Sequence, residues 1–161
     1  MDLLDFVETE LYFDEPLSTE VSQLLATASA EYGSLEAELA LLRASVLSPK
    51  HLSVLVALYR YYFYQHRLVA ALQVAERALF QVGLRLALPD SWRNLSESAV
   101  AAAGEKSMGL LRFYLMVLKS AGYLNLRMGN YEMGQAMLEK LVELDSHDRM
   151  GGNALLDVLK K

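Results

Sequence analysis

Three histidines and a few neighbouring carboxylates are the side chains with which this sequence could do catalytic or metal chemistry. His51, His66 and His147 lie far apart in the chain, and none begins a spacing such as His-Glu-x-x-His, which sets two metal ligands on one helix face. The neighbouring carboxylates fall where helices normally display surface charge: Glu36 with Glu38, and Glu139 with Glu143. There is no Cys, and the glycines lack the strand context and Lys spacing of a phosphate-binding loop. We therefore expect a protein that is not an enzyme and that holds no metal and no cofactor.

A run from Tyr59 to Arg67 combines five aromatic rings with two arginines and a histidine. Such rings can stack on single-stranded RNA, which makes an RNA-binding helical protein a minor alternative. A helix distributes the rings around its axis, however, so that Tyr59 and Tyr62 turn to the core while Phe63 and Tyr64 face a groove. Core packing plus a peptide groove explains the run better, and the net charge of -5 disfavours a nucleic-acid partner.

The elements that position this run are predicted to be helices. The chain of 161 residues is 53% hydrophobic, 22% charged and contains only 3 Pro, which favours an all-α fold. Apolar residues recur at helical spacing in four stripes: Val21, Leu24, Leu25 and Ala28; Leu35, Leu39, Leu42 and Val46; Leu55, Leu58, Tyr59 and Tyr62; Leu68, Leu72, Ala75 and Leu79. Breaks are expected at Tyr32-Gly33-Ser34, Ser48-Pro49, Gln65-His66-Arg67 and Gly83. The helices should therefore be short and form antiparallel pairs.

These pairs repeat with a period of 34 residues. Superimposing residues 18–51 on 52–85 aligns Leu24 with Leu58, Ala37 with Ala71 and Ala44 with Ala78. The pattern resembles the tetratricopeptide repeat (TPR) family, in which such small residues let neighbouring helices cross closely. The resemblance implies a right-handed superhelical stack of helix-turn-helix units.

A third, weaker unit follows at 115–148, marked by Gly122, Gly134 and the turn Gly129-Asn130-Tyr131. We expect a single TPR-like domain over 1–161 with six parts: an acidic amphipathic N-terminal segment at 1–17, repeats at 18–51, 52–85 and 115–148, an inserted helix within 86–114, and a capping helix within 149–161.

The TPR resemblance implies a concave face built from the first helix of each unit. The partner-binding residues expected there are Val56, Arg60, Phe63 and Tyr64 in unit two, and Met116, Lys119, Tyr123, Leu126 and Arg127 in unit three. A groove of rings and bases suits a protein or peptide partner with apolar anchors and acidic residues, because rings offer contact area and Arg pairs with carboxylates.

Charge divides the chain into acidic ends and a basic middle. Residues 1–20 carry seven acids and no base, whereas residues 43–127 carry eleven bases and four acids. An acidic start excludes a secretory signal and no stretch suits a bilayer span, so we expect a cytoplasmic protein without membrane contact. Residues 1–17 either pack as an ordinary capping helix or dock at an interface, giving a homodimer or a self-occluded groove.

Two functions are consistent with these features. The first is a non-catalytic scaffold, adaptor or chaperone; size, acidity, three units and the acidic apolar N-terminus are similar to the type III secretion translocator chaperones, although their units are contiguous. The second is an accessory assembly or regulatory factor that docks on a folded bacterial enzyme complex through the insertion and Trp92.

Overall fold

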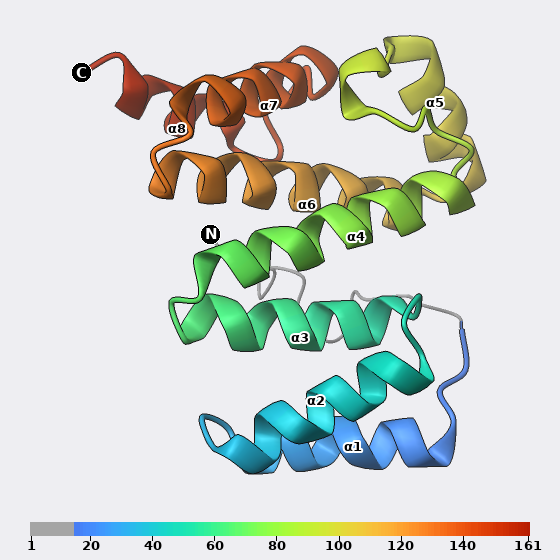
Figure 1. Cartoon of the computed structure of the whole chain (residues 1–161). Helices are drawn as coiled ribbons and strands as arrows, with labels where there is room; N and C mark the ends of the chain where they lie inside the picture. The colour runs from blue at the N-terminus through green and yellow to red at the C-terminus, as the bar shows by residue number, and fades with distance from the viewer. Residues whose placement is uncertain (1–14) are drawn as a thin grey trace.

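The computed structural model describes residues 15–161, and every regular element in this range is a helix (Figure 1). The elements are α1 (Thr19–Ala30), α2 (Leu35–Leu47), α3 (Leu52–Tyr64), α4 (Leu68–Arg85), the short 3₁₀ helix η2 (Trp92–Asn94), α5 (Glu97–Lys106), α6 (Met108–Arg127), α7 (Tyr131–Leu144) and α8 (Gly152–Leu159). The all-α prediction is confirmed for this part of the chain. Of the N-terminal segment 1–17, residues 1–14 lie outside the described residues.

Serine side chains fix where four of these helices begin. The hydroxyls of Ser18, Ser34, Ser96 and Ser107 each accept a hydrogen bond, 3.1–3.2 Å long, from the backbone N–H three residues later. Each bond satisfies a donor that the first helical turn would otherwise leave without a partner. These caps set the starts of α1, α2, α5 and α6.

Neighbouring helices in the chain pack on each other and form a stack (Figure 1). The pair α1 and α2 lies at one end, α3 and α4 follow, and α4 packs on α6, which pairs with α7. The inserted helix α5 packs on α6, and α8 packs on α7. None of the helices within residues 15–161 is both long and apolar enough to cross a membrane.

Small residues are buried near the start of the second helix of each pair. Ala37 of α2 and Ala71 of α4 are fully buried near the start of their helices, and Gly134 takes the same place in α7. At Gly134 a Cβ atom would lie only 2.8 Å from the carbonyl oxygen of Gly122 on α6. The α6–α7 crossing is therefore close enough that only glycine fits without a shift of the backbone.

The break expected at Gly83 is wrong, because α4 continues through this residue and ends at Arg85. Gly83 is buried against α6, where an added Cβ would lie 3.7 Å from the ring of Tyr114. A glycine inside a helix costs about 1 kcal/mol in propensity, and here the packing of α4 on α6 offsets that cost. The uninterrupted α4 spans 18 residues, against 12 and 13 for α1 and α2.

Candidate binding surfaces

The aromatic run places its rings beside a groove between α1 and α3. This groove has a volume of about 530 Å³, within the range of sites that hold a few side chains of a ligand. Its lining comes from three helices and the turn after α1: Leu25, Ala28, Ser29, Tyr32, Leu41, Ala57, Arg60, Tyr61 and Tyr64. Small side chains on α1 and α3 leave the space that the rings surround.

Three tyrosines form a ring cluster in this groove. Tyr32, in the turn between α1 and α2, lies with its ring centroid 5.9 Å from that of Tyr61 and 6.4 Å from that of Tyr64, both in edge-to-face orientation. The Tyr61 hydroxyl donates to the carbonyl oxygen of Ser34 at 3.4 Å. These contacts hold the rings in fixed orientations, so little conformational entropy is lost when a ligand packs on them.

Arg60 supplies the positive charge of the groove. Its side chain is partly exposed on α3 and forms no hydrogen bond or ion pair among residues 15–161. An arginine beside aromatic rings can hold a carboxylate through two parallel N–H donors. The groove thus combines apolar contact area with one site for an anion.

The structure separates the residues expected to form one continuous concave face. Arg60 and Tyr64 line the groove, and Phe63 lies beside it with its ring 5.6 Å from that of Tyr64 and stacked on Tyr59. Three others are buried instead, with 5%, 9% and 7% of their surfaces exposed: Val56, Met116 and Lys119. A residue buried to this degree contributes packing and offers a ligand almost no contact.

The remaining expected residues lie on α6, which contributes nothing to the lining of this groove. Leu126 is partly buried against Gly134 of α7. Arg127 is exposed and donates to the hydroxyl of Tyr123 at 3.1 Å, with its guanidinium 5.7 Å from that ring. Spacing along the chain does not reveal this separation, because α4 packs between α3 and α6 (Figure 1).

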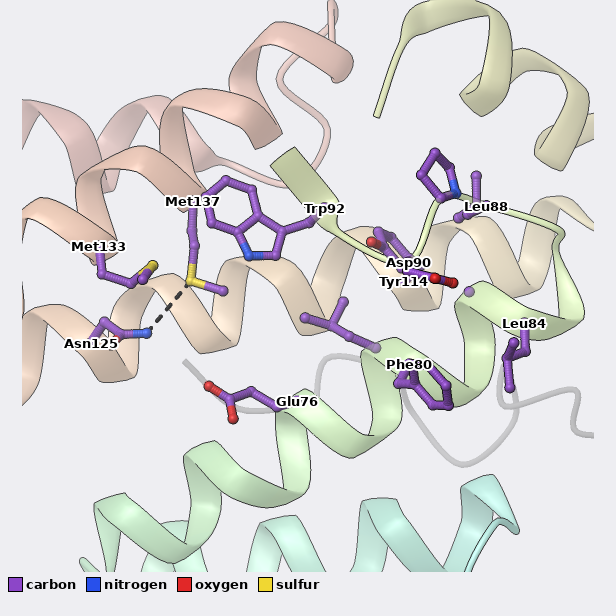
Figure 2. Close-up of a pocket in the computed structure, with 13 residues that line it drawn as sticks. Glu76, Phe80, Leu84, Leu88, Asp90, Trp92, Tyr114, Asn125, Met133 and Met137 are labelled. Atoms are coloured by element: carbon purple, nitrogen blue, oxygen red, sulfur yellow. Dashed lines mark hydrogen bonds between the residues drawn. The ribbon is translucent and has the colours of Figure 1, made fainter. Parts of the chain in front are cut away.

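A second cavity, of about 360 Å³, lies between α4, η2, α6 and α7 (Figure 2). Its apolar lining includes Phe80 and Leu84 of α4, Trp92 of η2 and Met133 and Met137 of α7. The sequence indicates Trp92 as a contact residue but not the α4 and α7 side chains around it. Of these side chains, Leu84 lies in the part of α4 that continues past Gly83, and the sequence pattern does not predict that continuation.

The indole of Trp92 is held at this cavity by local contacts. The Ser91 hydroxyl accepts from the backbone N–H of Arg93 at 3.2 Å and begins the η2 turn. The Arg93 guanidinium stacks 4.4 Å from the centre of the Trp92 ring system and donates to the sulfur of Met133 at 3.3 Å. Arg93 therefore links η2 to α7 beside the cavity.

Two polar groups from α6 also reach the cavity. Asn125 is buried; its side-chain N–H₂ donates to the carbonyl oxygen of Ala121 at 2.9 Å and approaches the sulfur of Met137 at 3.5 Å (Figure 2). Burial raises the pKa of Tyr114 from the ordinary 10.0 to about 12, so its phenol loses its proton less readily than an exposed tyrosine does. The lining also includes the carboxylates of Glu76 and Asp90, so the cavity suits a hydrophobic side chain of a partner beside a polar or basic group.

The histidines do not meet in the structure. His51 caps α3, since its Nδ1 accepts from the backbone N–H of Ser53 at 3.1 Å while its Nε2 lies 3.0 Å from the carbonyl oxygen of Glu15. The ring of His51 thereby connects the start of α3 to the backbone at Glu15. Among residues 15–161, no three His, Asp or Glu side chains gather closely enough to hold a metal ion. Sequence reasoning missed the capping role of His51, although its place directly before an apolar helix was a usable signal.

Comparison with known proteins places this chain in a family. No family model and no solved structure matches it. It is 53% identical over 159 residues to the "uncharacterized 19.8 kDa protein in nifW 5′ region" of Azotobacter chroococcum mcd 1, an alignment that covers 99% of this chain and 89% of that protein. The chain therefore belongs to the same family as the Azotobacter protein.

Proposed function

We propose that this protein is a non-catalytic scaffold, adaptor or chaperone that binds a peptide segment in the groove between α1 and α3. The observation that carries the proposal is Arg60, a cation without a partner among the described residues, beside the fixed cluster of Tyr32, Tyr61 and Tyr64. The segment that fits has an aromatic or aliphatic anchor followed closely by a carboxylate.

As part of this proposal, the stack has a TPR-like architecture, which the burial of small residues supports. The second helix of each of the first two pairs buries two alanines seven residues apart, Ala37 with Ala44 in α2 and Ala71 with Ala78 in α4. Such spacing lets each helix pair pack closely on its neighbours while the first helix of each pair presents its free face to a ligand. We also propose that the helix pairs form a right-handed superhelix.

Photo-crosslinking in cells of the native host tests the site. Replacing Tyr64, which is 41% exposed, with the photo-reactive p-benzoylphenylalanine should give a covalent adduct with the partner. Adding Arg60→Glu should lower the adduct yield about tenfold, because the carboxylate of the partner would meet a like charge.

Arg127→Glu is the matched control, since it reverses an exposed arginine that lies on α6 outside the groove. It should leave the yield unchanged. Equal yields in the Arg60→Glu and Arg127→Glu proteins, or an adduct that forms only from positions outside the groove, would refute the assignment.

A second function is an accessory factor that docks on a folded enzyme complex through the cavity around Trp92. The name of the Azotobacter relative places that protein in the nifW 5′ region, and a neighbourhood of one metabolic system would suit an assembly or regulatory factor better than a chaperone of secreted proteins. The exposed rings and sulfurs at this cavity, with Phe80 51% and Met133 41% exposed, would provide the contact.

The two functions predict different crosslinks. A photo-reactive residue at Phe80 should capture a folded subunit if the second function holds, and Trp92→Ala should then abolish capture without changing adducts from Tyr64. Capture from Tyr64 alone would leave the peptide-binding proposal in place and remove this alternative.

A further inference from the structure

The outer face of α2 exposes an apolar stripe that no described residue covers. Leu35, Leu39, Leu42 and Val46 recur at intervals of four, three and four residues, which aligns them along one side of the helix. They are 66%, 50%, 41% and 80% exposed. The opposite side of α2 supplies the interior, mostly with small residues: Ala37, Ala40, Leu41 and Ala44. The larger apolar side chains of this helix therefore lie mainly on its outside.

Four aligned, exposed aliphatic side chains on one helix are typical of an interface, not of a solvated surface. α2 belongs to the first helix pair of the stack (Figure 1), so a second molecule can reach the stripe. The groove between α1 and α3 takes only Leu41, from the interior side of α2, into its lining. Occupation of the stripe consequently leaves that groove open.

The stripe is self-complementary in an antiparallel arrangement. If two copies of α2 cross with their centre between residues 40 and 41, Leu39 of each copy meets Leu42 of the other, and Leu35 meets Val46. The spacing is symmetric about this centre, so one twofold axis satisfies all four contacts. An apolar stripe whose spacing lacked a symmetric centre could not pair with a second copy of itself in this way.

Charges along one edge of the stripe follow the same symmetry. Glu36 and Arg43 are seven residues apart, close to two helical turns, so they lie on the same edge. Both are exposed, and neither forms a hydrogen bond or ion pair with any residue in 15–161. The twofold axis keeps this edge on the same side of both copies, which brings Glu36 of each copy to Arg43 of the other.

On the other edge of the stripe, the negative charge of Glu38 is already paired within the same chain. Glu38 lies there and accepts a hydrogen bond from Arg67 at 2.6 Å within its own chain. This pair prevents the two copies of Glu38 from adding an unbalanced like charge at the symmetric interface. Both edges of the stripe are thus compatible with a second copy of the same chain.

We propose that the protein forms a twofold-symmetric homodimer through the α2 stripe, with reciprocal Glu36–Arg43 pairs across the interface. This inference does not rest on the proposed peptide groove. One helix about 20 Å long buries less than the roughly 800 Å² per partner of a standard interface, so the dimer should dissociate on dilution.

Sedimentation equilibrium of the full chain from about 1 to about 200 µM tests the proposal. The mass should rise with concentration from the 18.0 kDa of the chain toward twice that value. Glu36→Arg and Arg43→Glu should each raise the dissociation constant about ten- to thirtyfold, since two attractive pairs become repulsive. The double variant Glu36→Arg/Arg43→Glu should restore it to within about threefold of wild type, a rescue that a merely structural defect would not give.

Leu39→Glu should abolish the dimer, whereas Val69→Glu, at a 65% exposed position on α4, should not. A monomer at every concentration would overturn the proposal, as would a dimer that survives Leu39→Glu or a double variant that stays weak. If the chain is monomeric and Leu39→Glu lowers its melting temperature while Val69→Glu does not, a segment of the same chain covers the stripe, and the proposal is likewise wrong.

Discussion

The α6–α7 crossing offers the sharpest test of the packing described here, through the substitution Gly134→Ala. The added Cβ would lie 2.7 Å from Cδ2 of Leu126 and 2.8 Å from the carbonyl oxygen of Gly122. The leucine side chain can rotate away, but the carbonyl oxygen belongs to the backbone of α6. The two helices must therefore separate by several tenths of an ångström to admit one methyl group.

Two opposing terms set the size of the effect. Alanine gains about 1 kcal/mol over glycine in helix propensity, while overpacking a tight site costs about 1–3 kcal/mol and more where the backbone must move. With the contact made to a backbone atom, we expect the second term to exceed the first and the free energy of unfolding to fall by about 1–2 kcal/mol. At a urea m-value of about 2 kcal/mol/M the midpoint would drop by about 0.5–1 M.

Urea unfolding followed by far-ultraviolet circular dichroism measures this change, and Gly109→Ala is the matched control. Gly109 lies in the first turn of α6, and an added Cβ there would meet nothing within 4 Å. That variant should match the wild type or gain about 0.5 kcal/mol. A Gly134→Ala protein as stable as the Gly109→Ala protein would refute the close crossing of α6 and α7.

Three further substitutions have defined outcomes. Tyr114→Phe should remove a pH dependence of the free energy of unfolding. The pKa of Tyr114 is about 12 in the folded state and 10.0 ordinarily, so the unfolded chain loses the phenolic proton first as pH rises. Between pH 10 and 12, urea titrations should therefore show the wild type losing about 2 kcal/mol of stability relative to the variant. His51→Ala removes the α3 cap and the contact with Glu15, and should lower the free energy of unfolding by about 1–2 kcal/mol, whereas His51→Asn, which keeps a capping oxygen, should recover about half. Ala71 is fully buried, so the larger side chain in Ala71→Leu should not fit and should lower the melting temperature by about 3–10 °C. The control Ala102→Leu, on the exposed side of α5, should change the melting temperature little.

The helices of this fold could be predicted from the sequence because their signals are local. Serine caps and the glycine turn at Gly33, with a positive φ of 84°, set helix ends through interactions within a few residues. The break expected at Gly83 failed for the opposite reason. Whether a glycine ends a helix or lies inside one depends on the partner helix, here α6, which is distant in the chain.

The buried face of α2 could not be read from its apolar pattern. Periodicity shows that Leu35 and Leu39 share one side of the helix but not whether that side faces inward. The structure buries Ala37 and Ala44 instead, because small side chains permit the close approach of neighbouring helices, and this leaves the leucines outside.

The candidate groove was predictable only in part. Arg60 and Tyr64 were expected from the TPR resemblance, whereas Tyr32 joins them because the turn after α1 lies beside α3. The expected α6 residues do not reach this groove, since α4 lies between α3 and α6. Which helices line the groove depends on how the helices pack in space, and the spacing of residues along the chain does not show this.

The helices differ in how many residues they bury, and this affects how firmly each part of the stack is held. α1 buries only Val21 and Ala28, whereas α6 buries thirteen residues along its 20. Backbone amides of the first helix pair should thus exchange with deuterium earlier than those of α6, by way of openings that leave the rest of the molecule folded. Since α1 forms one wall of the tyrosine groove, such openings would widen this groove.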